Sequence, residues 1–180
     1  MHRGQNLSST HGLGNHNVQN IAGAIAVANT LGIPMEKLVY PVKQLESVPH
    51  RLQLLRQGNR IILDDSYNSN KNGFKAALDT LAMFQEMRIL MTPGMVELGA
   101  KQYDENKEVG VYAADKCDYA ILVGKEQTRP IQDGLLQAGF AQNRMIVVDT
   151  LQEAFQMVNA IPNERQKVVL IENDLPDNYS

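Results

Sequence analysis

The stretch Ile-Ile-Leu-Asp-Asp-Ser-Tyr-Asn-Ser-Asn at residues 61–70 shows the pattern on which the fold of this chain depends. Its first three residues are aliphatic and predict a buried strand, and all seven residues of 64–70 have side chains that can form hydrogen bonds, which is typical of a loop. Apolar residues then recur at the spacing of one helix face, at Phe74, Ala77, Leu78, Leu81 and Ala82. The order is therefore strand, polar loop and helix.

The same alternation continues to the end of the chain. Short aliphatic runs predict further buried strands at 88–91, 119–123, 145–148 and 167–171. Between them, helical spacing occurs at 109–113, 131–135 and 151–158, the last of these behind Thr150 as a predicted N-cap. Strands that alternate with helices predict an α/β fold with a doubly wound, mostly parallel sheet of Rossmann-like type.

The first sixty residues have a different character. Residues 1–16 are rich in Gly, Ser, Asn and His, and 18–31 read as an Ala-rich helix that ends at Gly32. The near-total apolarity of that helix predicts that it is buried. Residues 41–48 and 52–55 are expected to form short strands or an edge hairpin of the main sheet.

Composition excludes several classes of protein. The 180 residues are 43% hydrophobic and 21% charged, so a folded core is expected. Seventeen basic against twenty acidic residues give a net charge of −3 with no basic run, which argues against a nucleic-acid partner. The single cysteine, Cys117, excludes an internal disulfide, and no apolar run reaches the roughly 18 residues of a membrane span. We therefore expect a cytoplasmic protein.

Ligands of parallel α/β sheets bind beyond the carboxyl ends of the strands, so the loops at that edge carry the candidate site. The 64–70 loop predicts a sugar or nucleotide site, in which Asp65 accepts from a ribose hydroxyl and Asn68 or Asn70 contacts a base, a peptide group or a phosphate. The alternative is a solvated loop in which Asn70 caps the next helix. Asp64 and Asp65 are adjacent in sequence, so their side chains should diverge, which argues against a carboxylate pair for acid–base chemistry.

The other loops give weaker candidates. Glu97 lies in the loop after the second of the predicted strands, and Lys125 and Arg129 in the loop after the third, where they would bind an anion or remain solvated surface charges. The histidines have no second metal ligand at useful spacing, so no metal site is expected. A phosphate loop of the Gly-x4-Gly-Lys-[Ser/Thr] type is absent from the sequence.

Three stretches in order resemble the C-terminal part of a Mur ligase, the ATP-dependent amide-forming family of peptidoglycan synthesis. The segment 14–20 and the helix after it are similar to the H-N-x-x-N segment that ends the family's central ATPase domain, and Pro49-His50-Arg51-Leu52 follows. Residues 64–70 resemble the D-[DS]-Y-N-A-N signature of the member that adds D-alanyl-D-alanine to UDP-N-acetylmuramoyl-tripeptide, and 95–99 resemble its M-x-E-L-G. Two segments depart from the family pattern, 92–94 and the acidic 172–179.

The resemblance implies roles for particular residues. It assigns Asn20 to adenine, Arg51 to ATP phosphate or ribose, and Asp65 to ribose or the nucleotide edge. It places Tyr67, Asn68 and Asn70 on the side of ATP and the incoming dipeptide, with Asn17, Glu97, Lys125 and Arg129 as further candidates. An amide can both donate to and accept from adenine, and the planar guanidinium suits phosphate. No catalytic residue and no metal ligand is assigned to this chain.

The resemblance also implies cofactors, partners and domain limits. ATP and Mg²⁺ would serve the whole ligase, whose substrates would be UDP-MurNAc-tripeptide and D-Ala-D-Ala. Residues 1–46 would be the tail of a central ATPase domain and 47–180 the C-terminal substrate-binding domain, a truncation that is inactive alone because the other domains of the same chain are missing. Two alternatives remain at this point, a C-terminal domain of a folylpolyglutamate or cyanophycin synthetase type of ligase, and a stand-alone flavodoxin-like module that binds a nucleotide or a partner.

Overall fold

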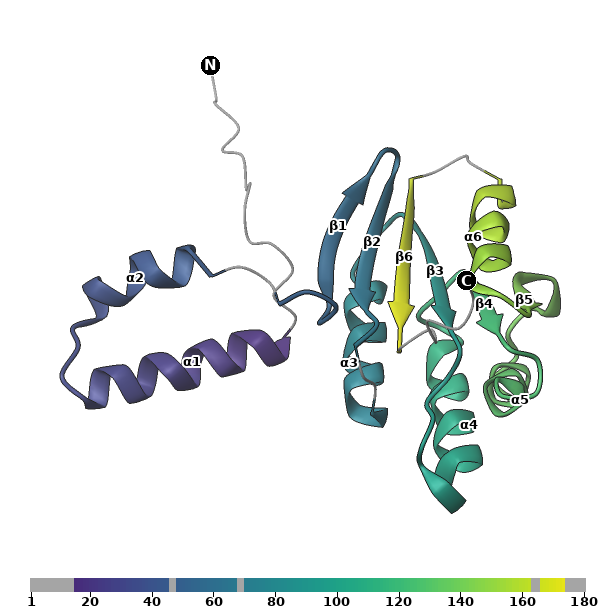
Figure 1. The fold of residues 1–180 in the computed structure, drawn as a ribbon, viewed down its shortest axis with the longest axis horizontal. Helices are drawn as coiled ribbons and strands as arrows, with labels where there is room; N and C mark the ends of the chain where they lie inside the picture. Colours follow the sequence, from purple (N-terminus) through teal and green to yellow (C-terminus); the bar gives the residue numbers. More distant parts are fainter. Residues whose placement is uncertain (1–14, 46–47, 68–69, 163–165, 174–180) are drawn as a thin grey trace.

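The computed structural model describes residues 15–45, 48–67, 70–162 and 166–173 of the chain. Within these ranges, a six-stranded sheet carries helices on both faces, and two helices precede it and lie to one side (Figure 1). The elements in order are α1 (Asn15–Thr30), α2 (Met35–Lys43), β1 (Gln53–Gln57), β2 (Arg60–Asp65), α3 (Lys71–Ala82), β3 (Met87–Thr92), η1 (Gly99–Lys101), α4 (Gln102–Ala113), β4 (Tyr119–Val123), α5 (Arg129–Gln137), η2 (Gln142–Arg144), β5 (Met145–Val148), α6 (Leu151–Ala160) and β6 (Lys167–Glu172).

The sheet confirms the predicted fold class. Its strand order is β1-β2-β6-β3-β4-β5, and every neighbouring pair is parallel except β1 with β2. All five predicted strands are present, although β5 lies at the edge of the sheet and its residues are only half-buried, and the prediction of an edge strand at 52–55 is confirmed by β1. The last strand, β6, lies between β2 and β3, so its Leu170 pairs with Leu63 on one side and with Leu90 on the other.

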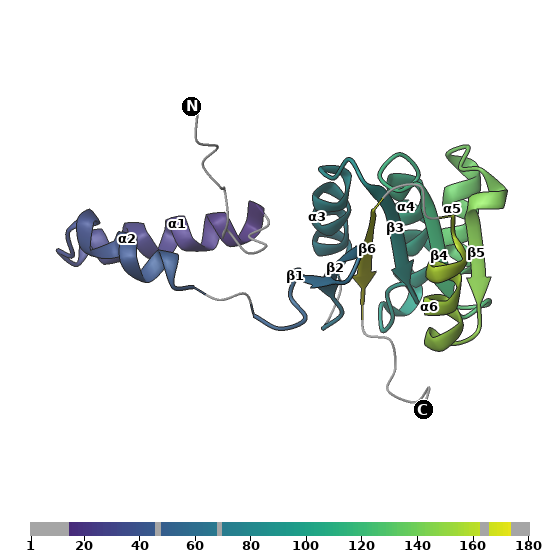
Figure 2. The same cartoon turned by 90° about the horizontal axis from the view of Figure 1, so that it is seen from above.

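The core consists of two layers, one on each face of the sheet. Helices α3, α4 and α5 cover one face and α6 covers part of the other (Figure 2). Successive strand residues point to opposite faces, so Leu90 packs in the first layer while Ile89 and Met91 pack in the second. Phe74 and Leu78 of α3 are fully buried, as the helical spacing predicts, and such burial contributes about 1.5–3 kcal/mol for each side chain.

Helices α4 and α5 approach each other through two glycines. A Cβ atom added at Gly110 would overlap the backbone carbonyl of Ile131, and one added at Gly134 would overlap the carbonyl of Lys107. A side chain at either position would therefore force the two helix backbones apart. The absence of a side chain is what permits this contact, which holds α5 against the first core layer.

The predicted strand at residues 41–48 is wrong at 41–43, which lie inside α2, and residues 46–47 of that prediction lie outside the described residues. The apolar residues Leu38, Val42 and Leu45 are spaced for one face of a helix, and with Pro41 they line a groove of about 240 Å³ between α1 and α2. The missing N–H of Pro41 costs α2 one hydrogen bond, and the helix ends two residues later at Lys43.

Helix α1 ends as predicted, with Gly32 at φ 83° just beyond it, but the predicted burial of its apolar side chains is wrong. Helices α1 and α2 pack on each other at one side of the sheet (Figures 1 and 2). This contact leaves apolar side chains uncovered, since Val27 is 62% exposed and Leu31 is 77% exposed. Apolarity alone predicted a buried helix because a sequence does not show which neighbour is there to cover it.

Candidate functional site

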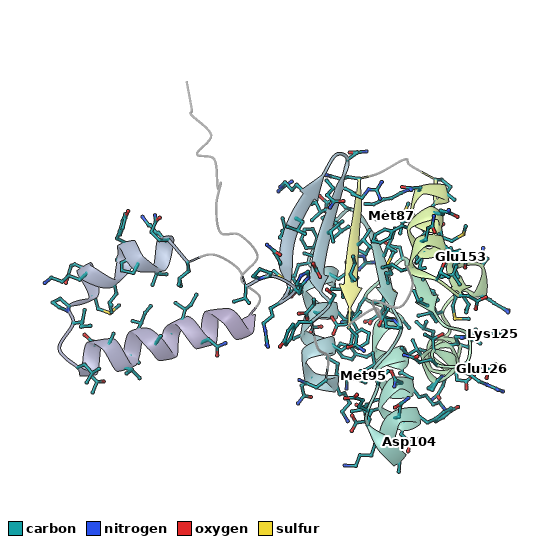
Figure 3. All side chains as sticks on the ribbon, in the orientation of Figure 1. Met87, Met95, Asp104, Lys125, Glu126 and Glu153 are labelled. Carbon is teal, nitrogen blue, oxygen red and sulfur yellow. The ribbon has the colours of Figure 1, made fainter. Side chains whose placement is uncertain are left out.

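The loops that carry the predicted site lie at one end of the sheet, beyond the carboxyl ends of the parallel strands. This end is at the bottom of Figure 1, where the arrowheads of β2, β3 and β6 point. In Figure 3, Met95 and Lys125 lie toward this end, whereas Met87, at the start of β3, lies at the opposite end. The loops after β2, β3, β4 and β6 therefore share an edge, as a parallel sheet requires.

Asp64 holds the loop after β2 to the segment before β1. Its buried carboxylate accepts hydrogen bonds from the backbone N–H of Ser66 (3.2 Å) and from the Ser66 hydroxyl (2.6 Å). The other oxygen lies 2.9 Å from Nδ1 of His50. The Ser66 hydroxyl lies 3.2 Å from that same nitrogen. A catalytic triad needs the serine and the acid on opposite ring nitrogens, so this Ser-His-Asp group is structural.

Asp65 makes a second connection to the same segment. Its Oδ1 accepts the backbone N–H of Leu52 at 2.9 Å. Leu52 has φ 50° and His50 has φ 59°, left-handed conformations that cost of order 1 kcal/mol or more for residues other than glycine. The two carboxylates therefore stabilise a strained turn at 50–52. The two carboxylates hold different partners, and the expectation that they form no acid–base pair stays a prediction.

Arg51, between the two left-handed residues, is placed beside Tyr67. Its guanidinium carbon lies 4.7 Å from the centre of the Tyr67 ring, within cation–π range. The backbone N–H of Tyr67 donates to the carbonyl of His50 at 3.1 Å, which joins the two segments again. Arg51 is exposed and Tyr67 is 61% exposed, so both present polar atoms to solvent at the sheet end.

Asn70 is the N-cap of α3. Its Oδ1 accepts from the backbone N–H groups of Asn72 (3.1 Å) and Gly73 (3.0 Å). The alternative interpretation of Asn70 as a helix cap is therefore confirmed, and a binding role for its amide stays a prediction. Asn68 lies outside the described residues.

Glu97 is presented by the loop after β3. Glu97 is exposed and has φ 63°. It lies two residues after Met95, whose side chain is completely buried. Asn106 of α4 fixes this loop: its Oδ1 accepts from the N–H of Met95 (2.8 Å) and its Nδ2 donates to the carbonyl of Met95 (2.9 Å). Glu97 is thus an exposed carboxylate on a firmly anchored loop.

The remaining predicted residues belong to other elements than Arg51 and Asp65. Lys125 and Arg129 are exposed in the loop after β4 and at the start of α5, and β6 and β3 separate β4 from β2. Asn20 is exposed on α1, which packs against α2. Asn17 also lies on α1, and its side chain lies outside the part described. The structure therefore places Arg51, Asp65 and Tyr67 on directly bonded segments, and it separates Lys125 and Arg129 from β2 by two strands.

Sequence reasoning missed two buried amides, Asn106 and Asn173. Asn106 occupies the same face of α4 as the buried Val109, Gly110 and Ala113, and a polar residue within such an apolar stripe is a signal that could have marked it. Asn173, directly after β6, is 4% exposed, and its partner Gly94 is 79 positions away in the sequence. No local pattern predicts such a contact.

The described ranges hold neither a cluster of metal ligands nor a helix suited to a membrane. Across residues 15–45, 48–67, 70–162 and 166–173, no three His, Cys, Asp or Glu side chains gather as a metal site would need. None of the helices in these ranges combines the length and the apolar character that crossing a bilayer requires.

Comparisons with known proteins agree on one family. A family model described as "Mur ligase, glutamate ligase domain" matches residues 50–172. The UDP-N-acetylmuramoyl-tripeptide–D-alanyl-D-alanine ligase of Escherichia coli is 34% identical over 115 residues, which make up 63% of this chain and 25% of that protein. This chain thus spans about a quarter of the length of the curated relative.

Solved structures show the same likeness over more of the chain. A crystal structure of MurF from Acinetobacter baumannii covers 90% of this chain, with a TM-score of 0.75 and 25% identity, and the match is 35% of that protein. A MurF ligase from Thermotoga maritima, solved in complex with ADP, covers 89% of this chain and matches over 35% of its own length, with a TM-score of 0.72. At 20% identity, this second likeness shows the fold alone.

Proposed function

Because the chain belongs to the Mur ligase family, through the glutamate ligase domain that matches residues 50–172, we propose that it is the C-terminal domain of an ATP-dependent ligase. The reaction we propose adds D-Ala-D-Ala to UDP-MurNAc-tripeptide in peptidoglycan precursor synthesis. The observation that carries the proposal is the group formed by Arg51, Asp65 and Tyr67 at the carboxyl end of the sheet. The likeness to the UDP-N-acetylmuramoyl-tripeptide–D-alanyl-D-alanine ligase of Escherichia coli supports this substrate over others in the family.

The proposed chemistry makes one amide bond for each ATP. The tripeptide carboxylate attacks the γ-phosphorus of ATP, an acyl phosphate forms and ADP leaves. The amine of D-Ala-D-Ala then attacks the acyl carbon, the C–N bond forms, and the C–O bond to phosphate breaks as the nitrogen loses a proton. Such a reaction depends on the positioning of three substrates and on stabilisation of negative charge, both of which increase when domains close around them.

Within this scheme, Arg51 supplies positive charge to the nucleotide. Its planar guanidinium can bind a phosphate oxygen or a ribose hydroxyl, and the Tyr67 ring beneath it restricts its orientation. Asp65 acts partly through the backbone of the neighbouring turn. Its carboxylate accepts a hydrogen bond from the N–H of Leu52, and this bond holds the turn that carries Arg51. The direct role proposed for Asp65, acceptance from a ribose hydroxyl, would add to this structural one.

The exposed apolar surface of α1 and α2 supports the proposed domain limits. Val27, Leu31 and Tyr40 are 62–77% exposed in a segment that lies outside the matched family model. We assign residues 1–46 to the end of a central ATPase domain, whose remainder would cover this surface, and 47–180 to the C-terminal domain. Asn20 would then contact adenine from the ATPase side, and Arg51 would approach the same nucleotide from the other.

The described residues do not fit a resident metal ion, since no suitable cluster of ligands occurs among them. We therefore place the Mg²⁺ of the proposed reaction with the nucleotide phosphates and the ATPase domain. On this proposal the present chain contributes charge and positioning, and it has no turnover by itself.

The substrate requirement for ADP formation tests the proposed function. A polypeptide that carries this chain behind its ATPase and UDP-sugar domains should release ADP only when UDP-MurNAc-tripeptide and D-Ala-D-Ala are both present. D-glutamate offered with UDP-MurNAc-L-alanine is the matched control and should give no turnover. Equal ADP release with the control substrates, or none with the proposed pair, would contradict the proposal.

A further inference from the structure

Four consecutive backbone groups in the loop after β3 are held by side chains. The N–H of Gly94 donates to Oγ1 of Thr92 at 2.9 Å, and its carbonyl accepts from Nδ2 of Asn173. The N–H and the carbonyl of Met95 both bond to Asn106. Thr92, Asn106 and Asn173 are all at most 4% exposed, so water does not compete for these hydrogen bonds.

Asn173 differs from the other two because it also bonds to the end of strand β2. Its backbone N–H donates to the carbonyl of Asp65 at 3.2 Å, while its side chain donates to Gly94. It follows β6, the strand that separates β2 from β3. One residue thus connects the end of β2, where Asp65 lies, with the loop that carries Glu97.

The conformation of Asn173 explains why an asparagine serves here. Its φ of 70° is left-handed, a region that asparagine enters at a lower cost than most residues. Glycine would adopt this backbone but has no side-chain donor, and aspartate would direct a carboxylate oxygen at the Gly94 carbonyl. The position therefore requires both a permissive backbone and an N–H donor.

We propose that Asn173 is a positioning residue of the candidate site, which sets the loop of Glu97 relative to Asp65 at the end of β2. Val96 and Glu97 follow the anchored Gly94 and Met95 directly and are exposed at the sheet end. Release of Gly94 from Asn173 would let this pair move with respect to Arg51 and Asp65. The connection itself is independent of any ligand, whereas its importance for catalysis rests on the proposed function.

Two variants of the 180-residue chain separate the two connections of Asn173. Asn173→Gly removes the side-chain donor and keeps the left-handed backbone, whereas Asn173→Ala removes the donor and strains the backbone. Asn143→Gly, at an exposed asparagine of η2, is the matched control. Backbone amide hydrogen exchange, followed by NMR, measures the local opening of each loop.

We expect Asn173→Gly to speed exchange at Gly94 and Met95 by about tenfold or more, with the amide of residue 173 still protected. Asn173→Ala should speed exchange at residue 173 as well, and Asn143→Gly should leave all three amides unchanged. Unchanged protection of Gly94 and Met95 in Asn173→Gly, or uniform acceleration across the chain, would overturn the proposal. If neither variant folds, the native chain decides: these three amides should open together, with a free energy below that of global unfolding.

A kinetic measurement on the longer ligase connects the residue to the reaction. Asn173→Gly should lower kcat by about tenfold or more while the melting temperature and the KM for ATP stay near those of the parent. A fall in melting temperature with unchanged kcat would show a purely structural role and contradict the proposal. Absence of ligase activity in the parent protein would contradict the proposed function instead, and the exchange result would still stand.

Discussion

At the scale of single residues, several polar side chains of the candidate site already have structural partners. Asp65, Tyr67 and Arg51 could be selected from the sequence because they fall in short motifs. Their mutual arrangement could not be predicted from the sequence, because it depends on the left-handed conformations of His50 and Leu52. Neither residue is a glycine or an asparagine, the types that adopt this conformation most easily. Local propensities predict the ordinary conformation at such positions, and tertiary hydrogen bonds override it here.

Asn70 gives a prediction about stability. Asn70→Ala removes the acceptor for two backbone N–H groups at the start of α3, so the free energy of unfolding should fall by about 1 kcal/mol. Asn72→Ala, two residues further along and exposed, keeps the cap and should cost little or nothing. Urea unfolding of both variants measures the difference, and equal stabilities would contradict the capping role.

Cys117 gives a prediction about reactivity. Burial raises the pKa of this thiol to about 12, and the side chain is 4% exposed, so little thiolate is available at pH 8. A disulfide reagent should label native Cys117 at least about 100-fold more slowly than the unfolded chain. A cysteine introduced at exposed Val96 is the positive control, and fast labelling of both positions would show that Cys117 is not buried.

At the scale of elements, periodicity predicted the strands and the α/β class because a buried parallel strand and an amphipathic helix have distinct patterns. It failed at residues 41–48, where Pro41 favoured an extended segment but the spacing of Leu38, Val42 and Leu45 suits a helix beside α1. The close contact of α4 with α5 could not be predicted from the sequence either, since a glycine in a helix does not show which backbone approaches it.

The contact between α4 and α5 gives a prediction at this scale. Gly110→Ala or Gly134→Ala should lower the free energy of unfolding by about 2 kcal/mol or more, because the added Cβ meets a backbone carbonyl of the neighbouring helix. Gly23→Ala in α1, which has no atom within 4 Å of the added Cβ, is the matched control and should be neutral or stabilising. Thermal melts compare them, and similar effects at all three positions would contradict the close packing.

At the scale of the whole molecule, the chain combines a well-packed α/β unit with a helical hairpin whose apolar side chains are exposed. The sequence predicted the α/β unit and the first helix of the hairpin but not the second helix, and it placed the candidate loops at the carboxyl end of the sheet through the general rule for parallel strands. It could not predict how the parts are covered, because exposure depends on neighbours and not on composition. A cytoplasmic location and the binding of ATP, Mg²⁺ and the two substrates stay predictions.

The most direct test of the central claim is the effect of Arg51→Ala on ligase turnover. Measured as kcat/KM for ATP in the polypeptide that carries this chain with its ATPase domain, the substitution should cost about 10- to 100-fold, the range for one lost charge-assisted hydrogen bond. Arg56→Ala, at an exposed arginine of β1, should leave kcat/KM within about twofold. Equal turnover of the Arg51→Ala and Arg56→Ala variants would contradict the account, because the group at the carboxyl end of the sheet would then have no part in the reaction.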